Sequence, residues 1–182
     1  MEEKMFCFQC QETAGCKGCT IAGVCGKSPE VAALQDLLIY TTKGLAVVAD
    51  QLRKEGKSVD PSINHRITKN LFTTITNANF DRESITSIIE ETLQTKEALL
   101  KETEENDLAK AALWNGSKET FMAKAKMVGI LSTKDEDIRS LRELITYGLK
   151  GLSAYTKHAN ALLHDDEAVD AFIASTLAKT LD

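Results

Sequence analysis

The chain has 182 residues, a formal net charge of −5, 43% hydrophobic residues and 27% charged residues. A chain of this length can bury a full hydrophobic core without disulfides, and an acidic balance with no visible basic face argues against a nucleic-acid partner. The acidic start is not followed by an apolar signal segment, and no apolar stretch approaches the roughly 20 residues of a membrane span. We therefore expect a cytoplasmic protein with no membrane partner.

All five cysteines lie in one segment, FCFQCQETAGCKGCTIAGVCGK, at residues 6 to 27. Cytoplasmic thiols stay reduced, so this clustering indicates metal or redox chemistry rather than disulfides. Two four-cysteine sites can be drawn. Cys7, Cys10, Cys16 and Cys19 form two close CxxC pairs, which is typical of a tetrahedral zinc site. Cys7, Cys10, Cys19 and Cys25, separated by two, eight and five residues, span enough chain to surround an iron–sulfur cube.

Composition favours the iron–sulfur interpretation. Four of the ten glycines fall at positions 15, 18, 23 and 26, where they let the backbone approach a bulky inorganic core and aim N–H groups at sulfur. Lys17 and Lys27 are placed to offset the negative charge of thiolates, and no histidine lies nearby. A structural zinc knuckle, in a helical interaction module without a redox role, stays the alternative.

After the cysteine segment the apolar residues follow a helical period. Ser28 and Pro29 form a helix start, and Gly56 marks the end of that helix. A second helix is predicted from the stripe Ile63, Ile67, Leu71 and Ile75. A third begins at Asp81, where Phe80 and Ile85 are spaced for a hydrophobic staple.

The C-terminal part is predicted to hold two longer helices after an irregular stretch. One or two short helices are expected before residue 132, split by Asn115 and Gly116. Thr133 and Glu136 have capping-box spacing ahead of a long helix. The apolar face of this helix comprises Ile138, Leu141, Ile145, Leu149, Leu152 and Tyr155. A last helix begins near Asp165 and is expected to bury Val169, Phe172, Ile173 and Leu177.

These patterns predict an all-α protein of helical bundles preceded by a cysteine-rich loop. The sequence Lys-Gly-Leu recurs at 43–45 and 150–152 inside similar helical stretches, which indicates two related bundles of which the second is incomplete, unless the similarity is chance. The expected segments are the cysteine loop at 1–27, a first bundle at 28–105, a connector at 106–132 and part of a second bundle at 133–182. We expect the whole to be an N-terminal fragment of a longer enzyme.

Several motifs together resemble one known family. MFCFQCQET at 5 to 13, GCTIAGVCGK at 18 to 27 and the helix opening PEVAALQDLLIY closely resemble the start of the hybrid cluster proteins, also called prismane proteins or hydroxylamine reductases. The Cys-x2-Cys-x8-Cys-x5-Cys spacing is the pattern of this family's anaerobe-type members. The match is specific through about residue 50 and softer beyond it.

The resemblance implies that Cys7, Cys10, Cys19 and Cys25 hold a [4Fe–4S] electron-transfer cluster, while Cys16 has no counterpart. It also implies an electron-donor partner, such as a reductase or a ferredoxin-like protein. The family's second, hybrid iron–sulfur–oxygen cluster takes its ligands from later domains, and this chain has no cysteine after Cys25. We therefore predict no catalytic residue within the chain. Hydroxylamine or nitric oxide reduction is expected only of a full-length protein.

Overall fold

The computed structural model describes residues 5–105 and 107–181, so the expected segment limits at 1, 106 and 182 lie outside the described residues. Within them the chain forms seven α-helices and three short 3-10 helices. The α-helices are α1 (Pro29–Lys54), α2 (Pro61–Thr73), α3 (Arg82–Leu100), α4 (Lys110–Leu113), α5 (Lys118–Val128), α6 (Glu136–Ala161) and α7 (Glu167–Ala178). The 3-10 helices are η1 (Ala14–Cys16), η2 (Ile130–Ser132) and η3 (Lys179–Leu181). The all-α prediction with a cysteine-rich loop at its head is confirmed.

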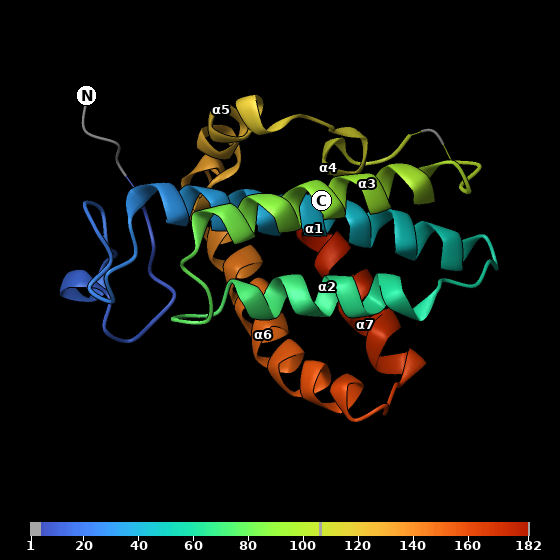
Figure 1. The fold of residues 1–182 in the computed structure, drawn as a ribbon. Helices are drawn as coiled ribbons and strands as arrows, with labels where there is room; N and C mark the ends of the chain where they lie inside the picture. Colours follow the sequence, from blue (N-terminus) through green and yellow to red (C-terminus); the bar gives the residue numbers. More distant parts are fainter. Residues whose placement is uncertain (1–4, 106, 182) are drawn as a thin grey trace.

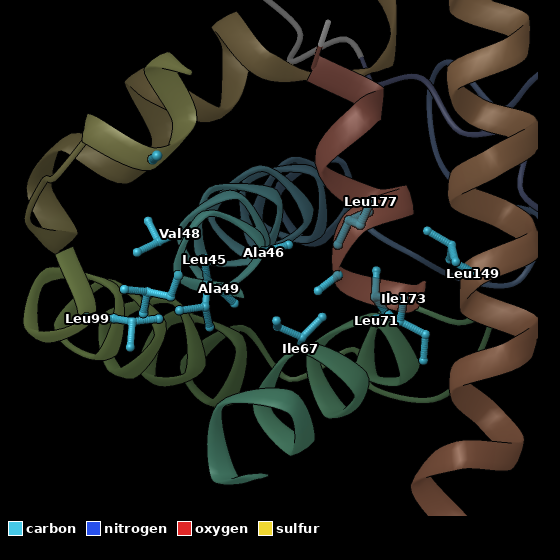
Figure 2. Packing of buried hydrophobic residues seen from close by; sticks show 13 residues of the cluster. Leu45, Ala46, Val48, Ala49, Ile67, Leu71, Leu99, Leu149, Ile173 and Leu177 are labelled. Carbon is cyan, nitrogen blue, oxygen red and sulfur yellow. The ribbon is translucent and has the colours of Figure 1, made fainter. Parts of the chain in front are cut away.

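The central element is α1, which packs against α2, α3, α4, α5 and α7. It begins as predicted, because the hydroxyl of Ser28 accepts a 3.2 Å hydrogen bond from the amide of Val31 and Pro29 occupies the first turn. Its C-terminal half lies in the larger of the two main hydrophobic clusters, together with residues from α2, α3, α4, α6 and α7 (Figure 2). Leu45, Leu52, Leu71 and Leu177 are fully buried there.

The N-terminal half of α1 lies in a second cluster, formed with α3 and α5. Leu37, Leu38, Ile85 and Ile89 have no exposed surface, and Phe121 of α5 is 1% exposed. Burial of side chains of this size contributes about 1.5–3 kcal/mol each relative to exposure. The cysteine-rich loop extends beyond this end of α1, at the left of Figure 1. Its position is fixed by a small cluster of Met5, Cys19 and Ala32.

The expectation that no apolar stretch approaches the length of a membrane span is wrong. One helix is long and apolar enough to cross a membrane, judged by length and composition only. Helix α1 passes that test over Pro29–Lys54, but 72% of its apolar window is buried inside the fold. A helix surrounded by other helices is apolar on most of its faces. The composition of α1 therefore fits its role as the core helix.

Helix α6 differs from its prediction in two ways. Its N-cap is Asp135, whose carboxylate accepts a 3.0 Å hydrogen bond from the amide of Ile138, rather than Thr133. The hydroxyl of Thr133 instead accepts a hydrogen bond from the guanidinium of Arg142. On its predicted apolar face Leu149 is buried, but Leu141 is 60% exposed and Ile138, Ile145 and Tyr155 are also exposed.

Two further expectations are corrected. Ile75 lies beyond the end of α2, because that helix ends at Thr73 and the chain turns through Thr74. Phe172 is 55% exposed, whereas its neighbour Ile173 is buried against the core. Successive residues of a helix point about 100° apart, so α7 buries only one of this apolar pair.

The expected division into two bundles stays a prediction. Helix α7 packs on α1, and α6 packs on α2, so residues from both expected bundles share the larger cluster. The expected connector does contain two short helices, α4 and α5, separated at Asn115 and Gly116.

Candidate metal centre

The cysteine-rich loop is folded back on itself by a pair of backbone hydrogen bonds. The amide of Cys7 donates to the carbonyl of Cys19 at 3.0 Å, and the amide of Cys19 donates to the carbonyl of Cys7 at 2.8 Å. The hydroxyl of Thr13 donates to the same Cys7 carbonyl at 3.0 Å. The intervening chain turns through η1. Two cysteines twelve positions apart are therefore held side by side.

Two glycines in the loop are required by close packing. Gly18 has a φ of +143°, and a Cβ there would lie 2.6 Å from the ring of Phe6. A Cβ at Gly23 would lie 3.1 Å from the sulfur of Cys25 and 3.0 Å from the Cβ of Lys27. A side chain at position 23 would crowd the Cys25 thiol, so glycine keeps the space beside that sulfur open.

Four of the five cysteines line one small hollow, which we call the thiol hollow. Its wall comprises Cys7, Gln9, Cys10, Thr13, Cys19, Gly23, Val24, Cys25, Lys27 and Thr76. Cys16 is exposed at the end of η1 and does not belong to this wall. The grouping corresponds to the x2, x8, x5 spacing. The ligand assignment itself stays a prediction.

At Cys19 the surroundings favour thiolate over thiol. Backbone hydrogen bonds from Ala14 and then Val24 are the main causes that lower the pKa of Cys19, with Thr13 and the charge of Lys27 adding to them. Lys27 is only 3% exposed, and its amine lies 3.8 Å from the sulfur of Cys7. The second expected counter-charge, Lys17, is exposed in the loop. Lys27 therefore places a buried cation beside a thiol.

The two candidate metal groups, a single zinc ion and an iron–sulfur cube, need different arrangements of thiols. Among the residues that the structure describes, no three side chains of His, Cys, Asp or Glu gather closely enough to hold a single metal ion. Neither four-cysteine set is therefore assembled around a single point in this structure. A cube takes one thiolate at each of its four corners, and the four thiols that line the hollow, with the amine of Lys27 beside Cys7, supply that set of donors.

The loop is tied to the helical body through Gln9, which the sequence analysis missed. The side-chain amide of Gln9 donates to the carbonyl of Thr74 at 2.9 Å and to the hydroxyl of Thr76 at 3.2 Å. Its oxygen accepts a 2.7 Å hydrogen bond from the buried amine of Lys150 on α6. The only sequence signal at Lys150 was its place in the repeated Lys-Gly-Leu.

Fold and site together define an all-α protein headed by a cysteine-rich loop in which four thiols line one hollow. The chain matches the Prismane/CO dehydrogenase family over residues 5–182. It belongs to that family, and its resemblance to the hybrid cluster proteins is confirmed. Membership of this family implies iron–sulfur clusters.

Several curated proteins share more than half of their aligned residues with this chain. The chain is 54% identical over its whole length to "Hydroxylamine reductase" of Desulfovibrio desulfuricans. Over 98% of its length it is 55% identical to "Hydroxylamine reductase" of Clostridium perfringens and 53% identical to "Hydroxylamine reductase 2" of Clostridium acetobutylicum. It spans 34–36% of the length of these relatives.

Proposed function

We propose that this chain is the [4Fe–4S] electron-transfer part of a cytoplasmic hydroxylamine reductase. The observation that carries the proposal is the thiol hollow, where Cys7, Cys10, Cys19 and Cys25 share one wall and Cys16 does not. A bound cluster would supply one-electron storage at this end of the molecule. The relatives' name supports the assignment of the reaction.

The chain's own residues would hold and tune this group. The four thiolates supply the ligands, and the amide hydrogen bonds that lower the pKa of Cys19 favour its bound, deprotonated form. The ammonium of Lys27 offsets negative charge beside Cys7, which favours the reduced state. Burial of Lys27 keeps water from screening that charge.

The substrate chemistry belongs to the proposed full-length enzyme. Hydroxylamine takes up two electrons and two protons to give ammonia and water, and nitric oxide reduction would give nitrous oxide. An electron-donor reductase or ferredoxin-like protein would supply the electrons. Because Cys25 is the last cysteine of this sequence, the thiolates of a second, hybrid cluster would have to come from outside it.

Anaerobic reconstitution with ferrous iron and sulfide tests the proposal. We expect a brown protein with about four irons and four labile sulfides per chain, whose visible absorption bleaches with dithionite. A colourless protein with one zinc per chain would replace the proposal with the zinc-stapled interaction module. In the same preparation we expect no reduction of hydroxylamine by reduced methyl viologen. Turnover would overturn the assignment of catalysis to other domains.

A further inference from the structure

A cavity of about 500 Å³ lies away from the thiol hollow, beside α1. Its wall includes residues of α1, the chain at 109–111, the end of α5, the turn through η2 and the first part of α6. Four cations and two carboxylates face it: Lys43, Lys110, Lys124, Arg142, Asp36 and Glu143. Positive charge is therefore concentrated here on a chain whose net charge is −5.

Lys43 is the innermost cation. It is 9% exposed, and among the described residues no hydrogen bond or ion pair joins its amine to another side chain or to the backbone. Burial is the main cause that lowers the pKa of Lys43, and the carboxylate of Glu143 offsets this only in part. Because the ammonium has no direct partner among the described residues, it is a donor available to a counter-charge in the cavity.

Lys124 and Lys110 also line the cavity and add positive charge to its wall. The amine of Lys124 lies 4.7 Å from the ring centre of Tyr40 and 5.3 Å from that of Trp114, which orients it by cation–π contact. Burial lowers the pKa of Lys124, and the like charge of Lys110 lowers it further. An anion between these amines would relieve their repulsion.

The two carboxylates do not cancel this charge. Burial raises the pKa of Asp36 to about 7, so at neutral pH it carries only part of a negative charge. Glu143 is shared electrostatically between Lys43 and Lys150. Among the described residues, the three lysines Lys43, Lys110 and Lys124 therefore outweigh the charge of these two carboxylates. Ile39, Val128 and Ile130 add an apolar part to the wall.

We propose that this cavity binds a small, multiply charged oxyanion, a phosphate-bearing or polycarboxylate metabolite, with Lys43 as its buried anchor and Lys110 and Lys124 as its outer contacts. The inference goes beyond electron transfer and does not depend on the thiol hollow. Ligands of this class match clustered lysines because each oxygen can accept from a separate ammonium.

Inorganic pyrophosphate is a suitable probe, because Trp114 is the only tryptophan and contacts Lys124. We expect saturable quenching or enhancement of Trp114 fluorescence and matching heat in calorimetry, both absent with chloride at equal ionic strength. Lys43→Met should weaken binding about tenfold or more, the loss of roughly one charge-assisted contact. The exposed Lys101→Met variant should bind as the wild type does. Absence of saturable binding, or wild-type affinity in Lys43→Met, would overturn the proposal.

Two further variants separate binding from folding. Lys43→Arg keeps the charge and should retain binding, whereas Lys124→Met removes a partly exposed cation and should weaken binding in a folded protein. Without pyrophosphate, Lys43→Met should melt at the wild-type temperature or above it, because it removes a buried charge without a direct partner. If Lys43→Met fails to fold, unchanged affinity in Lys124→Met would still refute the site.

Discussion

The amine of Lys150 and the side-chain oxygen of Gln9 are 2.7 Å apart, although 141 positions separate the two residues in the sequence. Lys150 is 7% exposed on α6, and burial lowers its pKa to about 8. Gln9 lies between two cysteines of the thiol hollow and also donates to the carbonyl of Thr74. The side chain of Gln9 thus joins the cysteine-rich loop to the end of α2 and to α6.

Removing Gln9 should therefore destabilise the fold through Lys150. In Gln9→Leu the buried ammonium and the Thr74 carbonyl lose their partner, at an expected cost of roughly 1.5–3 kcal/mol in the free energy of unfolding. Lys150→Met should cost less, because it also removes the charge that is expensive to bury. The double variant should lose less than the sum of the two single variants. Urea unfolding at neutral pH measures each value.

A neighbouring glutamine supplies the control. Gln11 is exposed in the same loop, so Gln11→Leu should stay within about 0.5 kcal/mol of the wild type. Strictly additive losses in the Gln9 and Lys150 variants would mean that their contact does not stabilise the protein.

The features predicted correctly from the sequence are those that depend on residues close together in the chain, such as helix starts. Ser28 with Pro29, and Asp81, begin helices as expected because a cap depends on residues within one turn. At α6 the N-cap is Asp135, two positions after the expected Thr133. The helical period showed that α6 has an apolar face. It did not show that Leu141 would stay exposed, because burial depends on which helix packs opposite.

In the candidate site, too, the local motif could be predicted from the sequence and the long-range contacts could not. Spacing left two four-cysteine sets open. The family resemblance selected Cys7, Cys10, Cys19 and Cys25, and these four line one hollow. Gln9 was invisible as a tether because its partners come from helices far along the chain, and a lone glutamine carries no periodic or motif signal. Long-range side-chain contacts of this kind follow from the packing of α2 and α6, which spacing alone does not determine.

Gly44, inside α1, is predicted to resist replacement. A Cβ at this position would lie 2.2 Å from the carbonyl oxygen of Ala111, and the amine of Lys96 holds that oxygen by a 2.9 Å hydrogen bond. Helix propensity alone favours alanine by about 1 kcal/mol. The clash with backbone should reverse that sign, so we expect Gly44→Ala to lose about 1–3 kcal/mol in urea unfolding.

Gly148 on α6 is the matched control, because a Cβ there meets nothing within 4 Å. Gly148→Ala should gain up to about 1 kcal/mol from helix propensity. Stabilisation by both substitutions would show that α1 and the 109–111 segment separate easily, contrary to the packing described for Ala111.

Asp36 should make stability depend on pH in an unusual direction. Burial is the main cause that raises its pKa to about 7 from an ordinary value of 3.8, with Glu143 adding to the rise and Lys150 opposing it. Between these values the folded protein binds a proton at Asp36 that the unfolded chain has released. The free energy of unfolding should therefore fall as pH rises from about 4 to about 7, by at most about 4 kcal/mol from this group.

The effect is measured as the difference in unfolding free energy between the wild type and Asp36→Asn across that range. The difference reports the carboxyl together with its coupling to Glu143 and Lys150, since groups that do not interact with Asp36 titrate alike in both proteins. Asp107→Asn, at an exposed position, should keep the wild-type slope. An unchanged slope in Asp36→Asn would show that this carboxyl is not held protonated by the fold.

Cys16 and Cys25 separate the two interpretations of the metal centre. Cys25 lines the thiol hollow, whereas Cys16 is exposed at the end of η1. After anaerobic reconstitution, Cys25→Ser should lose most of its iron and its visible absorption, because a cube then lacks one thiolate corner. Cys16→Ser should load iron as the wild type does.

The opposite pattern of metal loss in these two variants would identify the other set of ligands. If Cys16→Ser loses its metal and Cys25→Ser retains it, the ligands are the two close CxxC pairs, and the loop would have to rearrange to bring Cys16 beside Cys19 around a single ion. Metal content by elemental analysis and circular dichroism of both variants distinguish this from simple misfolding, since α1 to α7 should keep their helicity in either case. Equal loss in both variants, with helicity intact, would refute both four-cysteine sets.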